Sequence, residues 1–576
     1  MKRNKKKNFK QKSFFFEDYN ESEIFFGKGN LKQVKISSNR IIFLFIIFLS
    51  LIFIFSIKII YLSLYPEQNI SVVKSPKNLL TERRDIVDRN GVIIARNIHI
   101  YSAGIRTKLV KDKKKFLTKL RLIIPDLNAN EIKIKLNREK FFYIQKRLTP
   151  EEKDKLWLLG HRAIVFDAKP HRIYPQKNLF SHILGQIDDS NNGISGIEKF
   201  YDNTLKNNKL LKTPVKLTLD SNLQHLIREE LINAKSHFNN SGSGALLMNV
   251  ENGEILSLVS LPDYDLNKRK LINQDIYSNK ITLGVYELGS VFKTFALAAG
   301  LENKNINTDT LFTNLEHSLT CDKYKISEHD KLPKDLSVEQ ILIRSSNIGA
   351  VKIVQKIGEK KYSEFLNSLE LFEKINFELE EIGTPLSFKW GKCKLATASF
   401  GHGITTTPLQ LAKAYAILGN GGFKIEPFII KKENKFIKKG EQIISYKTSN
   451  QINSILRKVV SLDEGTANFA NIEGYEVAGK TGTSLKYNSK EKLNTFVSLF
   501  PASRPKYVLL VMLDEPQSAP NYVYEFPPSE KFPEGYKYKG ENRNTSGWNT
   551  VVVAGKIIEK IGPILAIKNL QAFNNF

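Results

Sequence analysis

The chain has 576 residues, of which 41% are hydrophobic and 25% charged. These proportions are typical of a folded protein with two or three domains and exclude a disordered or collagen-like chain. Lys and Arg exceed Asp and Glu by 28, but the lysines are spread along the whole chain instead of forming a patch, so we expect no nucleic acid partner. Only Cys321 and Cys393 are present, which excludes a disulfide framework and a cysteine-based zinc site.

The N-terminal region changes character abruptly. Its first 40 residues hold eleven Lys or Arg and four acidic residues, and residues 41–65 are then almost entirely apolar. This run is long enough to cross a bilayer as one helix, with Lys58 near one end, where its stem can reach the headgroups. A buried core helix and a cleaved signal peptide are the alternatives, but the basic flank and the absence of a small-x-small cleavage site argue against both. We predict a cytoplasmic tail over 1–40 and a membrane anchor over 41–65, with the rest of the chain outside the cytoplasm.

The remaining chain divides into two regions. Residues 66–212 have the pattern of a mixed α+β region with turn signals such as Asp88-Arg89-Asn90-Gly91. After Pro214 the pattern becomes more regular: it predicts a helix over 223–234, strands over 244–250 and 254–260, several amphipathic helices, and a buried strand over 507–513. Strands at both ends with helices between them predict a sheet assembled from distant parts of the chain. We expect domains over 66–212 and 213–565, followed by a tail over 566–576.

One lysine allows two interpretations. Residues 474–481 match the phosphate-loop pattern of Gly, four residues, then Gly-Lys-Thr. Such a loop needs a helix starting at the lysine, because the helix amides hold the phosphates. After Lys480 the chain continues with Thr481-Gly482-Thr483-Ser484, a poor helix start, and Glu476 would place a carboxylate among the phosphates. The predicted topology also keeps this segment away from ATP. An ATPase stays a remote alternative, and residues 480–483 are predicted to form a strand segment.

A serine nucleophile is indicated upstream, at Ser290-Val291-Phe292-Lys293. Ser-x-x-Lys occurs four times in this Lys-rich chain, but only this copy follows a glycine and opens a helical run, over 291–301. The interval of three places Ser290 and Lys293 on one helix face, so that an amine can take the proton of a hydroxyl. Ser345-Ser346-Asn347 then follows a helix that begins with a capping-box pattern, and Lys480-Thr481-Gly482 comes later.

The ordered triple Ser-x-x-Lys, Ser-x-Asn and Lys-Thr-Gly is a signature of penicillin-binding proteins and class A β-lactamases. The chain resembles the class B penicillin-binding proteins, membrane-anchored D,D-transpeptidases of peptidoglycan synthesis, from about residue 80 to 560. Asp85 stands where this family usually has Gly, and Leu288 where Pro is common. The region around 502–517 resembles the cell-division (FtsI-type) branch more than the elongation branch, which stays an alternative. The other segments that carry the resemblance are Arg84 to Gly91, Arg172 to Pro175, His182 to Gly185, Gly193 to Glu198, and Phe400 to Ala412.

The resemblance implies an α+β fold with an N-terminal transmembrane helix, an elongated pedestal domain of the dimerisation type, and a transpeptidase domain. In the transpeptidase domain, the resemblance implies an antiparallel sheet flanked by helices, as in serine β-lactamases. Ser290 would attack the penultimate carbonyl of a D-Ala-D-Ala stem peptide. Lys293 would act as base, with its pKa lowered by burial and by a neighbouring cation such as Lys480. Ser345 would relay a proton to the leaving D-Ala, and Asn347 would hold Lys293 and the substrate amide. Lys480, Thr481 and Gly482 would line the site, Thr483 would bind the substrate carboxylate, and the backbone N–H groups of Ser290 and Thr483 would form the oxyanion hole.

The fate of the acyl-enzyme separates a transferase from a hydrolase. Class A β-lactamases have a Glu-x-x-Leu-Asn segment that directs water onto the ester; here Glu364-Phe365-Leu366-Asn367 is one residue short. We therefore predict transpeptidation at the division septum, with β-lactams as covalent inhibitors. A β-lactam sensor with the same motifs stays an alternative.

Partners, localisation and the remaining residues follow from the same resemblance. The expected partners are peptidoglycan stem peptides, β-lactams, the membrane, and an FtsW-type glycosyltransferase with other cell-division proteins. The expected location is the inner membrane, with a periplasmic catalytic domain. No metal or organic cofactor is implied. We expect a structural role for His402. Whether Cys321 and Cys393 pair is left open, with the unpaired state favoured, because the sequence does not fix their distance.

Overall fold

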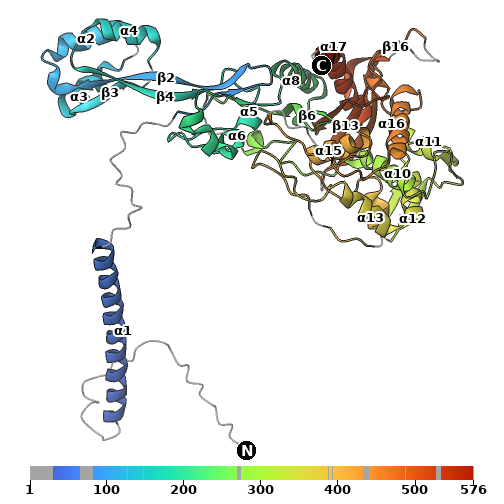
Figure 1. Cartoon of the computed structure of the whole chain (residues 1–576), viewed down its shortest axis with the longest axis horizontal. Helices are drawn as coiled ribbons and strands as arrows, with labels where there is room; N and C mark the ends of the chain where they lie inside the picture. The colour runs from blue at the N-terminus through green and yellow to red at the C-terminus, as the bar shows by residue number, and fades with distance from the viewer. Residues whose placement is uncertain are drawn as a thin grey trace, which may run out of the picture. The chain divides into compact units, whose positions relative to one another are not determined.

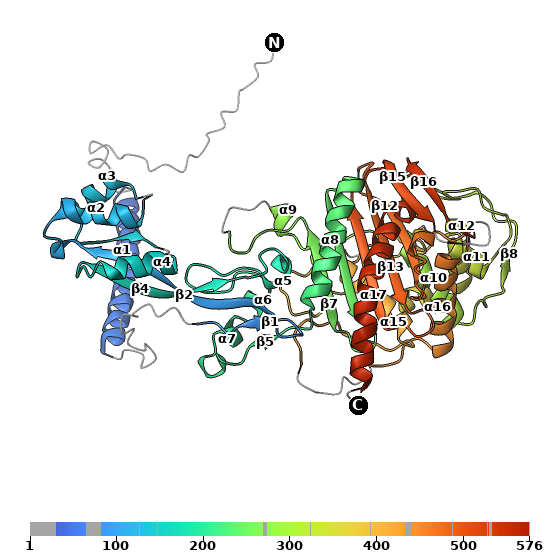
Figure 2. The ribbon, with the colours of Figure 1, turned by 90° about the horizontal axis from the view of Figure 1, so that it is seen from above.

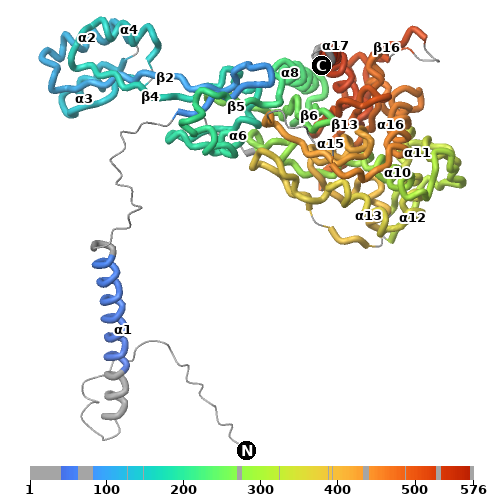
Figure 3. Tube along the Cα trace, in the orientation of Figure 1, coloured from blue at the N-terminus to red at the C-terminus, as the bar shows by residue number. Residues whose placement is uncertain are grey.

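The computed structural model describes the chain from residue 30 to 574 apart from short gaps, and its contacts divide the chain into two units, 1–79 and 80–576. Figure 3 follows the course of the backbone. The described residues are 30–64, 82–125, 127–146, 148–268, 274–322, 324–386, 388–391, 393–432, 440–486, 488–526, 528 and 533–574.

The described part of the first unit is the helix α1 (Asn30–Leu64) (Figure 1). Its stretch Arg40–Tyr61 has a mean hydropathy of 2.9, and no part of that stretch is buried against protein. This confirms the predicted apolar helix and is the property expected of a membrane anchor. The helix begins inside the predicted tail, at Asn30 rather than at residue 41; the rest of that tail, 1–29, lies outside the described residues.

The pedestal is built on two long strands, β2 (Ile93–Arg106) and β4 (Ile164–Ile173), which pair antiparallel over ten residues (Figure 2). At one end of this ribbon, three helices and β3 pack around a small separate core that includes Phe116, Leu120 and Leu136. At the other end β1 pairs with β2 and, in parallel, with β5. The smaller elements of the pedestal are β1 (Ile86–Val87), η2 (Thr107–Leu109), α2 (Lys113–Ile123), α3 (Ala129–Arg138), β3 (Phe141–Gln145), α4 (Pro150–Leu158), α5 (Ser181–Leu184), α6 (Gly196–Phe200), α7 (Asp202–Leu205), η3 (Asn208–Leu210) and β5 (Val215–Lys216).

Three pedestal segments that carried the family resemblance meet in a buried ion cluster. The Glu198 carboxylate accepts hydrogen bonds from Arg172 and Arg83 at 2.7 and 2.8 Å, and all three side chains are fully buried. Arg172 also donates to the Arg84 carbonyl at 2.8 Å. Buried charges persist when they are paired and hydrogen-bonded, as these are. These hydrogen bonds and ion pairs therefore hold the three pedestal segments together. Arg83 belongs to this ion cluster, although the sequence patterns did not single it out.

The catalytic sheet has the strand order β12-β13-β14-β6-β7, and every neighbouring pair is antiparallel. Two strands precede the helical middle of the chain and three follow it, as the sequence predicted. Every residue of β14 is buried, since α8 and α17 pack together against one face of the sheet and α15 and α16 cover the other (Figure 2). The bounds are β6 (Gly242–Asn249), β7 (Ile255–Leu261), β12 (Ala478–Leu485), β13 (Lys492–Phe500), β14 (Tyr507–Asp514), α8 (Ser221–Phe238), α15 (Pro408–Gly419), α16 (Tyr446–Ser461) and α17 (Thr550–Asn574).

The last helix corrects one predicted boundary. A separate tail was expected over 566–576, but α17 continues to Asn574. Its final turns contact the domain, because Lys568 forms an ion pair with Asp220 and the Asn569 side chain accepts a hydrogen bond from the Tyr507 hydroxyl at 3.0 Å. The remaining elements are α9 (Gln274–Tyr277), η4 (Gly289–Phe292), α10 (Lys293–Glu302), β8 (Leu311–Phe312), β9 (Ser318–Cys321), β10 (Tyr324–Ser327), β11 (Leu336–Ser337), α11 (Val338–Ile343), α12 (Asn347–Ile357), α13 (Glu359–Ser368), α14 (Lys394–Ala398), η5 (Asn468–Ala470), β15 (Ala519–Phe526), β16 (Tyr536–Glu541) and η6 (Ser546–Trp548).

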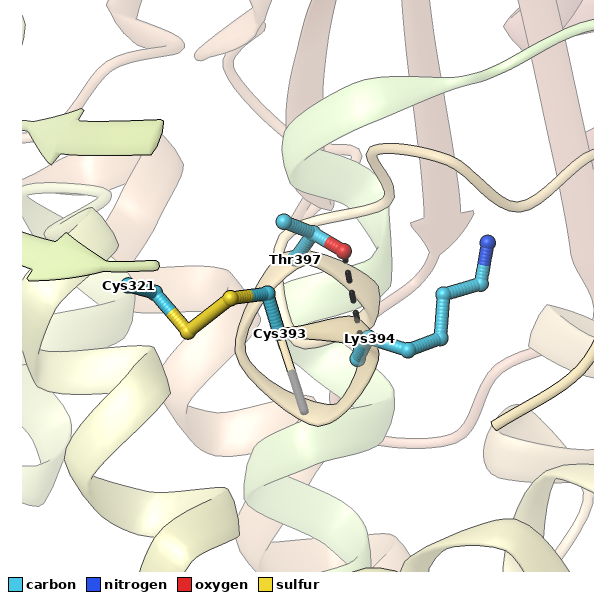
Figure 4. Close-up of a disulfide and its surroundings, with 4 residues drawn as sticks. All are labelled: Cys321, Cys393, Lys394 and Thr397. Atoms are coloured by element: carbon cyan, nitrogen blue, oxygen red, sulfur yellow. Dashed lines mark hydrogen bonds between the residues drawn. A yellow bond between two sulfur atoms is a disulfide. The ribbon is translucent and has the colours of Figure 1, made fainter. Parts of the chain in front are cut away.

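The two cysteines form a disulfide, with their Cα atoms 5.7 Å apart (Figure 4). This corrects the favoured unpaired state. The bond joins the last residue of β9, Cys321, to Cys393, the residue before α14, across 72 positions of sequence. Nothing local to either cysteine could reveal a pairing over that separation.

Candidate active site

The predicted nucleophile lies on a tight turn before a buried helix. Ser290 lies in the single 3₁₀ turn η4, which leads directly into α10. Phe292 and Phe295 are fully buried and fix this segment in the core. Lys293 follows one turn after the serine, and only 2% of its surface is exposed. The predicted Ser-x-x-Lys geometry, a serine at a helix start with its lysine one turn on, is therefore present.

The second motif occupies the connection between α11 and α12. Ser345 has φ = +59°, in the left-handed region that residues other than glycine rarely adopt, at a cost of about 1–3 kcal/mol. The next residue, Ser346, caps α12, because its hydroxyl oxygen accepts the N–H of Gly349 at 2.9 Å. A helix begun in this way holds Ser345 in its unfavourable conformation and orients its side chain.

The third motif lies on β12, the edge strand of the sheet. Lys480 pairs across to Val497 of β13, and its side chain is fully buried. A phosphate loop would require a helix starting at this lysine, whereas residues 478–485 form a strand. The remote ATPase interpretation is therefore excluded by the secondary structure.

The three motifs converge on one hydroxyl group. Ser345 Oγ lies 3.1 Å from Lys293 Nζ and 2.9 Å from Lys480 Nζ. The Lys293 amino group also donates to the Ser345 backbone carbonyl. A serine hydroxyl can accept hydrogen bonds from both amino groups, or donate its proton to one that is neutral. The shared contact therefore couples the protonation of the two lysines.

The pKa values of both lysines are lowered in this site. Burial lowers the pKa of Lys293 to about 7, against an opposing effect of the Glu328 carboxylate, which raises it. Burial and the nearby Lys293 cation hold the pKa of Lys480 well below its usual value. A neutral amine is thus accessible near pH 7, as a general base requires.

The nucleophile turn lies directly against the Lys-Thr-Gly strand. Gly289 has φ = +66°, and a Cβ atom at this position would come within 2.6 Å of the Thr483 carbonyl. A side chain on Gly482 would likewise collide with the Leu288 carbonyl. Glycine is therefore required on both sides of the contact. The close approach brings the backbone of Thr483 next to Gly289, the residue before Ser290.

Two threonines of β12 connect the site to neighbouring segments. The Thr481 hydroxyl lies 3.0 Å from that of Thr466, and the Thr483 hydroxyl accepts the N–H of Ser546 at 3.0 Å. Both hydroxyls are thus oriented by neighbours outside the three motifs. An oriented hydroxyl of this kind can bind a carboxylate.

Comparisons with known proteins agree with this geometry. The profile of the penicillin binding protein transpeptidase domain matches residues 243–526, and that of the penicillin-binding protein dimerisation domain matches residues 79–216. The probable peptidoglycan D,D-transpeptidase FtsI of Caulobacter vibrioides is 30% identical over 506 residues, covering 84% of this chain and 82% of the relative. The chain belongs to the class B penicillin-binding proteins.

Other members of the family resemble the chain over similar lengths. The peptidoglycan D,D-transpeptidase FtsI of Buchnera aphidicola (subspecies Baizongia pistaciae) is 29% identical over 553 residues, 86% of this chain and 94% of the relative. The crystal structure of penicillin binding protein 3 from Mycobacterium tuberculosis, complexed with aztreonam, matches with a TM-score of 0.63 at 20% identity, over 85% of this chain and 96% of that one. The pedestal and transpeptidase domains thus have the fold of this family.

Two contacts that the sequence led us to expect, from Ser290 to Lys293 and from Asn347 to Lys293, are absent among the described residues. Among the described residues no hydrogen bond joins Ser290 Oγ to Lys293, whose amino group contacts Ser345 instead. The Asn347 amide was expected to hold Lys293, but it donates to the Ser327 carbonyl at 2.8 Å. The Ser345 carbonyl contacts the lysine instead.

Sequence reasoning missed Glu328 and the partner of His402. His402 forms an ion pair with Glu287 at 2.9 Å, and this carboxylate raises the pKa of the imidazole. The contact ties the loop after α14 to the segment before Ser290, in line with the expected structural role. Among the described residues, no cluster of three or more His, Cys, Asp or Glu side chains could hold a metal ion.

Proposed function

We propose that this class B penicillin-binding protein crosslinks peptidoglycan stem peptides at the division septum through an acyl-ester on Ser290. The observation that carries the proposal is the contact of two buried lysines with the Ser345 hydroxyl beside the Ser290 turn. Relatives named FtsI and the resemblance around 502–517 support the division branch over the elongation branch.

Acylation begins when the Ser290 hydroxyl attacks the penultimate D-Ala carbonyl of a stem peptide. The Oγ–C bond forms as the hydroxyl proton moves to the neutral amine of Lys293. The backbone N–H groups of Ser290 and Thr483 stabilise the oxyanion. Thr481 and Thr483 bind the terminal carboxylate, while Gly482 lets the strand lie against the nucleophile turn.

Release of D-Ala needs a proton on the departing nitrogen. Ser345 supplies it and recovers a proton from the lysine pair, because its hydroxyl lies within hydrogen-bonding distance of both Lys293 and Lys480. The C–N bond then breaks and leaves an ester on Ser290. An amine of a second stem peptide attacks this ester: the new C–N bond forms, the C–Oγ bond to Ser290 breaks, and the proton lost by the amine returns through Lys293 to the Ser290 hydroxyl. β-Lactams enter the same first step and remain as the ester.

The nucleophile is tested by covalent labelling. Incubation with benzylpenicillin adds one penicilloyl group by intact mass, and peptide mapping places it on Ser290. Ser290→Ala abolishes the adduct, whereas Ser489→Ala, which alters a Ser-x-x-Lys copy on an exposed turn, leaves it unchanged. An adduct on any other serine refutes the assignment.

A crosslinking assay separates the enzyme from a β-lactam sensor. A sensor with the same motifs would form the penicilloyl ester but would not join stem peptides. We expect the full-length protein to produce crosslinked muropeptides from nascent strands when a partner glycosyltransferase supplies them. Labelling without crosslinks would favour the sensor.

The membrane arrangement is part of the proposal. The basic segment before α1 stays in the cytoplasm and the catalytic domain faces the periplasm. An FtsW-type glycosyltransferase, along with other division proteins, contacts α1 and the pedestal. Replacing residues 41–65 with an unrelated span of equal length abolishes co-purification while penicillin labelling persists; unchanged co-purification contradicts the contact.

A further inference from the structure

A hairpin outside the three motifs ends at the start of α12. Strands β9 and β10 pair antiparallel, with Ser318 opposite Ser327 at one end of the ladder and Cys321 opposite Tyr324 at the other. Glu328 directly follows β10. The Glu328 carboxylate accepts a hydrogen bond from the Ser346 hydroxyl at 2.5 Å. It also accepts the backbone N–H groups of Asn347 and Ile348 at 2.7 and 2.9 Å. A carboxylate that binds the first amides of a helix also benefits from the helix dipole.

These contacts fix the residues that directly follow Ser345. Its left-handed conformation depends on where the next residue starts α12. Both its carbonyl and its hydroxyl bind Lys293, and its hydroxyl binds Lys480. A small displacement of residues 346–348 therefore moves the hydroxyl away from both amines. The Asn347 amide adds a fourth bond to the hairpin, through the Ser327 carbonyl.

The hairpin is itself held covalently. Its last β9 residue is bonded to Cys393, at the start of α14 (Figure 4). After α14 the chain reaches Gly401, which lies so close to the Gly289 carbonyl that a side chain there would collide with it. The disulfide thus links two segments that contact the site from different directions, one at Ser346 and one at Gly289.

We propose that Glu328 is a positioning residue of the acyl-transfer site: it holds Ser345 beneath the two lysines through the first turn of α12, and the disulfide holds the hairpin that carries it. The inference rests on the proposed role of Lys293 as base. In addition, the charge of Glu328 acts on Lys293 and raises its pKa.

The principal test compares two capping carboxylates. Glu328→Gln keeps the shape of the side chain but removes the charge and presents an NH₂ group to a backbone donor. Glu302→Gln is the matched control, since Glu302 accepts hydrogen bonds from the Ser445 backbone and hydroxyl at 3.1 and 2.8 Å at the start of another helix, α16. We measure the second-order rate constant of acylation by a fluorescent penicillin on full-length protein, corrected for the fraction of molecules that react. Glu328→Gln lowers the constant about 10- to 100-fold, and the control stays near wild type.

The pH profile distinguishes positioning from general loss of structure. Loss of the Glu328 charge lowers the pKa of Lys293 and so moves the acid limb of the profile to lower pH, because Lys293 then loses its proton more easily. The other charged groups around Lys293 and Glu328 are Lys480 on β12, Lys492 on β13, and His329 and Asp330 beside the carboxylate. Burial and the Lys293 cation lower the pKa of His329, so a titration of this imidazole is removed by repeating the comparison with His329→Gln in both proteins, where the shift must persist.

The outcomes are distinct. An unchanged rate and profile in Glu328→Gln overturn the proposal. A slower rate with an unmoved acid limb, beside a wild-type rate in Glu302→Gln, supports the positioning of Ser345 and refutes the part assigned to the charge of Glu328. We expect the double variant Cys321→Ser, Cys393→Ser to lower the acylation rate constant by a smaller factor than Glu328→Gln does, without moving the acid limb of the pH profile. An acylation rate constant equal to that of the wild type refutes the part assigned to the disulfide. If Ser290 still carries the adduct in every variant, the proposed function stands whatever the result for Glu328.

Discussion

At the scale of single residues, the site depends on two lysines that share one partner. Ammonium groups that both contact Ser345 Oγ repel each other, and burial removes the water that would screen them. The protein reduces this cost by deprotonation. The shared hydroxyl thereby links the protonation states of Lys293 and Lys480, so the pair titrates as a unit.

The pH dependence of acylation tests this account. Lys293 acts as base only when neutral, and its pKa is lowered to about 7. The acylation rate constant should therefore rise about tenfold per pH unit below that pKa and level off above about pH 8. It is measured between pH 5 and 10 with a fluorescent penicillin, correcting for hydrolysis of the reagent. A profile that still rises above pH 9 would show that the lysine has an ordinary pKa.

The sequence singled out the candidate residues of the three motifs but not the residues that support them. Spacing and order select Ser290, Lys293, Ser345 and Lys480, because each motif is continuous in the chain, and the structure brings the last three together. Glu328 belongs to no recognised pattern, and its contacts become visible only when the hairpin is folded. The same limit explains Asn347, whose amide binds a carbonyl twenty residues earlier.

At the scale of elements, the site is a contact between a turn and an edge strand. The turn η4 and strand β12 approach so closely that Gly289 and Gly482 have no room for a side chain. Both elements are anchored in the core, by Phe292 on one side and by the ladder of β12 with β13 on the other. Neither η4 nor β12 can move away from the other without disturbing buried packing.

Gly289→Ala tests this contact. Its Cβ would lie 2.6 Å from the Thr483 carbonyl, so the turn and the strand must separate and the oxyanion donors move apart. We expect the acylation rate constant to fall about 100-fold.

Gly474→Ala is the matched control for that variant. Gly474 also has a positive φ, +82°, but a Cβ there meets nothing within 4 Å. It carries the backbone strain without the collision and should acylate at nearly the wild-type rate. Equal losses in the two variants would assign the effect to strain alone.

Local patterns predicted the elements of the catalytic domain more accurately than the domain's end. The boundaries of the strands expected over 244–250, 254–260 and 507–513 differ by at most two residues from those of β6, β7 and β14. The tail expected over 566–576 is wrong because the contact of Lys568 with Asp220 joins residues 348 positions apart. The disulfide was missed for the same reason, as both depend on distant contacts.

At the scale of the whole molecule, the anchor and the catalytic part are separate units. The contacts divide the chain at residue 79, before the first strand of the pedestal. All the residues that form the site lie in the second unit, which has its own extensive core. The catalytic chemistry should therefore not depend on α1.

A truncation tests this separation. Residues 80–576 should remain in the soluble fraction and should be acylated with a rate constant within about twofold of the full-length protein, since no site residue is lost. Fractionation and fluorescent penicillin labelling measure the two properties together. A soluble fragment that fails to label would show that the anchor supports the site.

The strand order of the catalytic sheet has a consequence for biosynthesis. Strands β6 and β7 leave the ribosome long before β12, β13 and β14, yet β6 lies between β7 and β14 in the finished sheet. Until β14 is made, at residues 507–514 of 576, one side of β6 lacks its neighbour, and an open, apolar strand edge of this kind favours aggregation. We therefore expect nascent chains to need protection from aggregation, and a premature stop codon before residue 507 to yield an aggregating fragment rather than a weakened enzyme.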